Sequence, residues 1–214
     1  MNIDKSLIIT ETDTLNKMRD KIYQNAINHG WHEGERSIDE YCALFHSEVS
    51  EFFEEFRLPE PKALYFDTHN YNISILDKNG IHKADEAEKI DNILSMEYKW
   101  NHFEEIAKHK PLGYGIELAD LVIRLLDFCG ENDIEYNVIH ANVYTQDIPN
   151  IFHDVMMLHE TINQYYAYQD YANIISLILL CFSVSIKYNF DLNEMIRIKH
   201  KYNLTRIRKH GRRF

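Results

Sequence analysis

Apolar residues recur at helical spacing along the segment Tyr41–Phe56, and this pattern is typical of an amphipathic helix. Glu48 lies inside the apolar stripe, with Leu44 and Phe45 one turn before it and Phe52 one turn after it. We therefore expect its carboxylate to point at a core rather than at water. Because a lone buried carboxylate is costly, the sequence predicts that something offsets the charge of Glu48.

A second stretch, 116–128, is apolar on nearly every side. Its charged residues share one helical stripe: Glu117, Asp120, Arg124 and Asp127. Such a stripe can simply face solvent. If this helix packs antiparallel to the first, however, four carboxylates surround one small volume, namely Glu48, Glu51, Glu117 and Asp120. These would repel one another, and Mg2+, which prefers hard oxygen ligands, would remove the penalty.

Several runs in this chain together resemble the all-α nucleoside triphosphate pyrophosphohydrolases of the MazG-like and dimeric dUTPase-like type. The signature runs are His46-Ser47-Glu48-Val49-Ser50-Glu51 and Gly115-Ile116-Glu117-Leu118-Ala119-Asp120, with Lys199, Asn203 and Arg206 near the C-terminal end. Flanking segments, such as Asn28-His29-Gly30-Trp31, also resemble segments of that family. The resemblance spans most of the chain in order, and it implies an all-α helical bundle.

The resemblance implies an enzyme that uses Mg2+, or Mn2+ in its place, to split a (deoxy)nucleoside triphosphate into a monophosphate and pyrophosphate. Its metal ligands would be Glu48, Glu51, Glu117 and Asp120, with Glu51, assisted by Glu48, activating the water. Lys199, Asn203 and Arg206 would bind the polyphosphate. Trp31 is a candidate for stacking on the base, although a core tryptophan is the commoner outcome.

Two interpretations are open for each of three further residues, Arg124, Asp127 and His32. Arg124 and Asp127 either orient the metal ligands or form a simple ion pair with each other. His32 either binds a base edge or is an exposed surface histidine.

Compact members of the family separate the two signature runs by a short loop, whereas here residues 52–116 lie between them. We expect an insertion over 58–112 that carries a small β-hairpin near 66–83, because Asn79-Gly80 is a hairpin turn signal. We expect residues 85–108 to form a further amphipathic helix. The insertion lies between the two helices that must pack together to close the metal site.

Helix signals dominate elsewhere. The capping box Ser37-x-x-Glu40 opens the helix that carries Glu48, an earlier helix should stop at Gly30, and Asp147 with Pro149 marks another start. Further helices are expected near 115–131, 148–168, 171–188 and 191–203.

A faint internal repeat is also present. Aligning His46 with His159 retains the apolar skeleton but places Thr161 and Gln164 at the positions of Glu48 and Glu51. Either two amphipathic helices coincide, or the chain is a tandem pseudo-repeat. In the second case a single all-α domain, 1–214, consists of a catalytic half, 1–140, and a degenerate half, 141–214. The protein would then be a pseudo-dimeric monomer, or a homo-oligomer such as the dimers usual in the family.

Charge and hydropathy narrow the alternatives. A net charge of -11 argues against general nucleic-acid or anionic-membrane binding. No signal peptide or membrane span is evident, so we expect a cytoplasmic protein. The segment 197–213, in contrast, contains eight Lys or Arg residues and no acid. It leaves open a nonenzymatic helical module that binds an acidic partner or nucleic acid through this segment, or a nucleotide-binding relative without turnover.

Overall fold

The computed structural model describes residues 12–66, 74–77, 80–83, 110–136 and 150–206. Six helices make up most of this part of the chain: α1 Thr12–Asn28, α2 Ile38–Phe56, α6 Tyr114–Glu131, α7 Ile151–Tyr168, α8 Tyr171–Lys187 and α9 Leu192–Leu204. The predicted all-α fold is confirmed. The expected helix over 85–108 and the start signal at Asp147 and Pro149 lie outside the described residues.

Local signals set the helix ends. The Ser37 side chain accepts a hydrogen bond from the Glu40 backbone amide, and the Glu40 carboxylate accepts one from the Ser37 amide, so the predicted capping box is formed. The chain turns after α1 at Gly30, which adopts a φ of 77°. Asn150 caps α7, and its side chain accepts a hydrogen bond from the backbone amide of His153.

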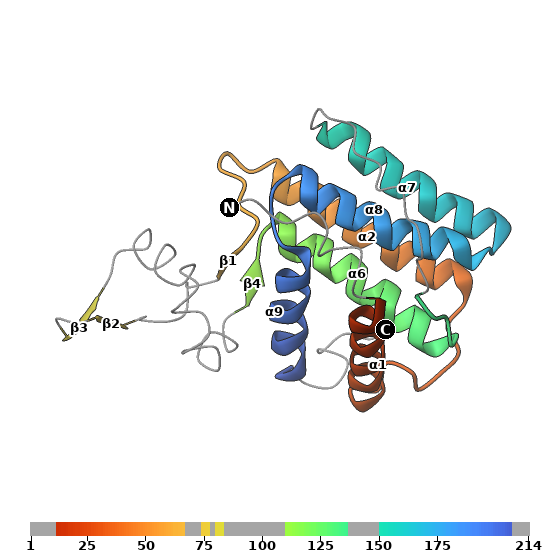
Figure 1. Cartoon of the computed structure of the whole chain (residues 1–214), viewed down its shortest axis with the longest axis horizontal. Coiled ribbons are helices and arrows are strands. Elements are labelled where there is room, and N and C mark those ends of the chain that lie inside the picture. The colour runs from red at the N-terminus through yellow and green to blue at the C-terminus, as the bar shows by residue number, and fades with distance from the viewer. Residues whose placement is uncertain (1–11, 67–73, 78–79, 84–109, 137–149, 207–214) are drawn as a thin grey trace.

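Helix α6 lies at the centre of the bundle, in contact with α1, α2, α8 and α9 (Figure 1). Leu118, Leu121 and Leu125 are fully buried, which explains why its sequence is apolar on nearly every side. Phe45, Val49 and Phe52 of α2 are equally buried. Each such side chain contributes about 1.5–3 kcal/mol by leaving water. This packing holds α2 and α6 together and so places the charged residues between them.

The boundaries of the insertion meet beside the start of α6. Strand β1, Tyr65–Phe66, pairs antiparallel with β4, Pro111–Leu112. Gly113 has a φ of 113°, and a Cβ atom there would lie 2.6 Å from the backbone oxygen of Lys62. The chain therefore leaves and re-enters the bundle at one point, and α6 can still pack against α2.

The predicted hairpin is present. Strands β2, Ser74–Asp77, and β3, Gly80–Lys83, pair antiparallel with Asp77 opposite Gly80. The turn residue Asn79 lies outside the described part of the chain.

The two positions aligned by the proposed repeat touch each other. The Nδ1 atoms of His46 on α2 and His159 on α7 lie 2.8 Å apart, and the two rings stack. Contact between equivalent positions is what a two-fold axis between two halves would produce. The division into a catalytic and a degenerate half stays a prediction.

No single helix in the described ranges is long and apolar enough to span a membrane, although α8 and α9, bent by 112° at their junction, satisfy a test of length and composition as a pair.

Close packing between α1 and α6 leads to a stability prediction. A Cβ atom at Gly130 would lie 2.5 Å from the Cβ atom of Tyr23. We expect Gly130→Ala to lower the free energy of unfolding by about 1 kcal/mol or more, since the forced movement outweighs the better helix propensity of alanine. Gly34→Ala is the matched control because no atom lies within 4 Å of its added carbon. Urea denaturation measures both, and equal effects would contradict this packing.

Candidate metal and anion site

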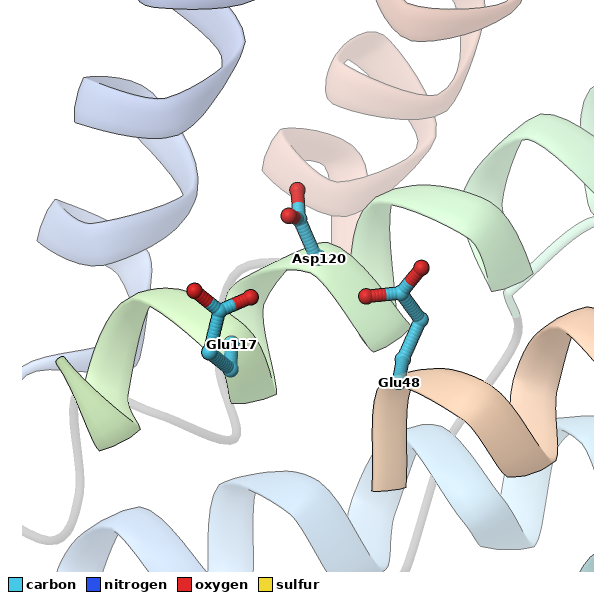
Figure 2. A group of neighbouring side chains, drawn as sticks. All are labelled: Glu48, Glu117 and Asp120. Carbon is cyan, nitrogen blue, oxygen red and sulfur yellow. The ribbon is translucent and has the colours of Figure 1, made fainter. Parts of the chain in front are cut away.

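Three carboxylates from two helices converge on one small region (Figure 2). Glu48 comes from α2, and Glu117 and Asp120 come from successive turns of α6. One oxygen from each lies within 4.8 Å of the others. Two oxygens bound to the same Mg2+ are roughly 3–4 Å apart, so small side-chain rotations would let all three reach one ion.

Burial separates this cluster from ordinary surface acids. Glu48 is 2% exposed and Glu117 is 6% exposed. Oε1 of Glu48 accepts a hydrogen bond from Nε of Arg124. Oε2 is buried and has no hydrogen-bond partner among the described residues. An unsatisfied carboxylate oxygen in a buried site fits a cation ligand.

The same burial perturbs the acidity of the cluster. Desolvation raises the pKa of Glu48 to about 7, against the opposing charge of Arg124. Desolvation likewise raises the pKa of Glu117 to about 7, against the charge of Lys199. Asp120 and Glu51 add repulsion in both cases. Near neutral pH the cluster therefore holds protons that a metal ion would displace.

Glu51 is the one predicted ligand outside the cluster. It is exposed on α2, and the Ser47 hydroxyl donates to its carboxylate over 3.4 Å. The expected set of four convergent carboxylates is thus two buried groups, Glu48 and Glu117, and the partly buried Asp120, with Glu51 nearby. A carboxylate that is not a ligand and faces solvent remains available to accept a proton.

Lys199, which we expected to bind the polyphosphate, lies against the carboxylate cluster. Its side chain is 5% exposed, and Nζ lies 2.6 Å from Oδ2 of Asp120. Burial opposes its charge, but Asp120 and Glu117 raise the pKa of Lys199 overall, so the ammonium stays charged. Lys199 therefore acts on the carboxylate cluster directly, as Arg124 does from the side of Glu48.

This ion pair gives a second prediction. Lys199→Gln should lower the free energy of unfolding by about 3 kcal/mol, because it leaves Asp120 unpaired beside two other buried acids. Arg197→Gln, an exposed position on the same helix, should change it by less than about 0.5 kcal/mol. Chemical denaturation in chelator measures both, and a neutral Lys199→Gln would show that the pair has no role in stability.

A cavity of about 110 Å³ opens beside the cluster, between α1, α2, α6 and α9. Eight residues predicted for the site line it: Trp31, Glu48, Glu51, Asp120, Arg124, Asp127, Asn203 and Arg206. Oδ1 of Asn203 is buried and, within the described part of the chain, has no hydrogen-bond partner. Neither Glu117 nor Lys199 is among the lining residues.

The structure decides between the interpretations of Arg124 and Asp127. Arg124 binds Glu48, whereas Oδ1 of Asp127 lies 2.8 Å from Nε2 of His32. The simple Arg124–Asp127 ion pair was therefore wrong. Arg124 is positioned to orient Glu48, whereas Asp127 binds His32 rather than a predicted metal ligand.

His32, expected either to bind a base edge or to be an exposed surface histidine, has both ring nitrogens next to carboxylates. Its other ring nitrogen, Nδ1, lies 3.3 Å from Oε1 of Glu131. Burial opposes protonation, but the bond to Asp127 and the charges of both acids raise the pKa of His32 overall. Two carboxylates can each accept a hydrogen bond only from a doubly protonated ring. His32 thus ties the loop after α1 to the end of α6.

Sequence reasoning missed Arg36. Its guanidinium donates to the Trp31 carbonyl over 3.0 Å and stands over the rings of Trp31 and Tyr41, 5.4 and 5.6 Å from their centres. A lone basic residue between Glu35 and the capping box was the available signal.

Comparisons with models of known protein families, with curated proteins and with solved structures find no match for this chain.

Proposed function

We propose that the protein is a Mg2+-dependent hydrolase that splits a (deoxy)nucleoside triphosphate into a nucleoside monophosphate and pyrophosphate. The observation that carries the proposal is the cluster of buried Glu48 and Glu117 with partly buried Asp120 on facing helices, beside a cavity that Asn203, Arg206 and Trp31 also line. Hard carboxylate ligands next to anion-binding and aromatic side chains suit a metal-bound polyphosphate.

The residues assigned to the metal are Glu48, Glu117 and Asp120. A bound Mg2+ would neutralise phosphate oxygens and lower the pKa of a coordinated water. Arg124 holds one oxygen of Glu48 and leaves the other for the ion. Lys199 holds Asp120 in the same way.

The remaining residues act on substrate and water. Glu51, exposed and one turn from Glu48, accepts the proton of the attacking water. That water attacks the α-phosphorus, the bond to the oxygen that bridges the α- and β-phosphates breaks, and pyrophosphate leaves. Arg206 and Asn203 donate hydrogen bonds to the phosphates, since a guanidinium suits their oxygens. Trp31 lies against the base, with Arg36 on one of its faces.

One observation favours a different candidate. Arg124 and Lys199 already offset part of the carboxylate charge, so the cluster could exist as an internal charge network in a nucleotide-binding protein without turnover. The other alternative, a module that binds through its basic C-terminal segment, depends largely on residues 207–214, outside the described part of the chain.

The test is pyrophosphate release from a panel of ribo- and deoxynucleoside triphosphates, with Mg2+, with Mn2+ and with chelator. We expect metal-dependent formation of equal amounts of monophosphate and pyrophosphate. Nucleotide binding without products would favour the relative without turnover. Absence of both, with circular dichroism showing an intact helical fold, would refute the proposal.

A further inference from the structure

A second, larger cavity of about 340 Å³ lies at the other end of α2 and α6, where the C-terminus of α7 meets the N-terminus of α8. Four aromatic residues line it: Tyr41, Phe128, Tyr165 and Tyr171. Its volume lies at the lower end of the range typical of small-molecule sites. It is separate from the carboxylate cluster, and nothing in the proposed reaction uses it.

The aromatic rings form an ordered wall around Phe128. The ring of Phe128 is buried and makes edge contacts with Tyr41, Tyr165 and Tyr171 at 4.9, 5.5 and 6.1 Å between centres. Tyr165 is buried and lies within 22° of parallel to Tyr171. Tyr171 is 44% exposed at the rim. The cavity therefore offers aromatic surface to a flat ligand that enters from solvent.

Hydrogen-bonding groups of both kinds surround this aromatic wall. Arg36 supplies donors and Glu131 supplies acceptors, while Asn132 and Gln169 each offer an amide. The amide oxygen of Asn132 accepts a hydrogen bond from the Tyr171 hydroxyl over 3.3 Å, so the rim is partly ordered without a ligand.

Gln169 is a strained residue at this rim. It ends α7 with a φ of 53°, in the left-handed conformation that favours glycine or asparagine at this position. A glutamine there gives up backbone stability and places an amide beside the cavity.

The charges decide the class of ligand. The guanidinium of Arg36 already stands over the Tyr41 ring, so the protein's own cation occupies the place that an organic cation would take. Arg36 already donates to the Trp31 carbonyl, and Glu131 already accepts from His32 and Tyr41, but a wholly apolar ligand would cut their remaining donors and acceptors off from water. A neutral, planar ring with donors and acceptors on its edge satisfies both the aromatic surface and the polar groups.

We infer that this second cavity, walled by Phe128, Tyr165 and Tyr171 and edged by Arg36, Glu131 and Gln169, binds a nucleobase-type heteroaromatic ring. The inference does not require a metal or turnover. Such a ring has two sources. It is either the base of a substrate whose phosphates reach the carboxylate cluster, which would then lie here instead of against Trp31, or a separate nucleoside. The two cavities share a wall, because Arg36 lines both and His32 bridges Asp127 in one to Glu131 in the other.

The experiment measures binding of unphosphorylated nucleosides, adenosine, guanosine, cytidine, uridine and thymidine, to the full chain in chelator by isothermal titration calorimetry. We expect at least one to bind, and Tyr171→Ala to weaken it about tenfold or more, as loss of a stacking partner does. Gln169→Gly should also weaken binding, while its thermal stability stays equal or rises because the strain is removed. Tyr168→Ala is the control, since Tyr168 is 77% exposed and does not line the cavity.

Two results would overturn the inference: no nucleoside binds at millimolar concentration, or binding is as strong in Tyr171→Ala and Gln169→Gly as in the control. Competition identifies the source of the ring. A nucleoside that displaces a nucleoside triphosphate, together with a raised KM in Tyr171→Ala, marks the substrate's own base, whereas simultaneous binding of both marks a separate site. Glu117→Gln should keep nucleoside binding, so failure of the proposed hydrolysis remains distinguishable.

Discussion

Replacing Glu48 by glutamine is expected to reduce metal-dependent pyrophosphate release by about 100-fold or more. Even residues that only orient metal ligands contribute about 10- to 100-fold, and Glu48 holds the one buried carboxylate oxygen of the cluster that has no hydrogen-bond partner within the described residues. The amide oxygen of glutamine can still accept the bond from Arg124, so the packing of α2 against α6 should survive.

The control for this variant is Glu54→Gln on the same helix. Glu54 is exposed and pairs with Arg57, away from the cluster. Its loss should leave turnover unchanged. Mg2+ affinity, measured by calorimetry, should fall with activity in Glu48→Gln alone. Full activity in Glu48→Gln would show that the metal assignment is wrong. Loss of metal binding in Glu48→Gln, with nucleotide binding retained, would support the metal assignment.

The second large effect is on stability as a function of pH. In chelator, we expect the free energy of unfolding to fall as pH rises from about 5 to 8. Burial raises the pKa of Glu48 and of Glu117 to about 7, from 4.5 in an accessible carboxyl. Between these values the folded protein binds more protons than the unfolded chain, so rising pH favours unfolding.

The size of this effect follows from the shifts. One pKa unit corresponds to about 1.4 kcal/mol, and the two groups interact, so we expect a loss of about 3 kcal/mol or more for the pair. In a chain of this length that corresponds to a fall in Tm of roughly 10 °C. His32 acts in the same direction, because its raised pKa gives stability that is lost as pH rises through it.

Adding metal distinguishes the contribution of the carboxylate cluster to the pH dependence of stability from that of His32. Saturating Mg2+ should restore Tm at pH 8, where the carboxylates are ionised, and should have little effect at pH 5.5, where protons compete for the same oxygens. Glu117→Gln should flatten the pH profile measured in chelator. Differential scanning calorimetry provides both curves. A Tm that rises with pH, or an equal Mg2+ effect at both pH values, would contradict buried titrating carboxylates.

Much of the fold was predictable because its signals are local. The capping box at Ser37, the stop at Gly30 and the apolar stripe around Glu48 each depend on residues within a few turns of one helix. The burial of Glu48 and the common face of Glu117 and Asp120 followed from periodicity, since i,i+3 and i,i+4 residues share a face. These features needed no knowledge of the tertiary arrangement.

The tertiary structure decided the partners of the charged residues. Lys199 lies in the last helix and binds Asp120 in α6, and Asp127 meets His32 from the loop after α1 rather than its neighbour Arg124. It also placed Glu51 outside the cluster and created the second cavity from the ends of α6 and α7 and the starts of α2 and α8. Such contacts depend on how helices distant in sequence cross, which periodicity does not specify. The sequence by itself therefore determined which faces are buried and which acids they carry, whereas only packing decided which cation lies against which carboxylate.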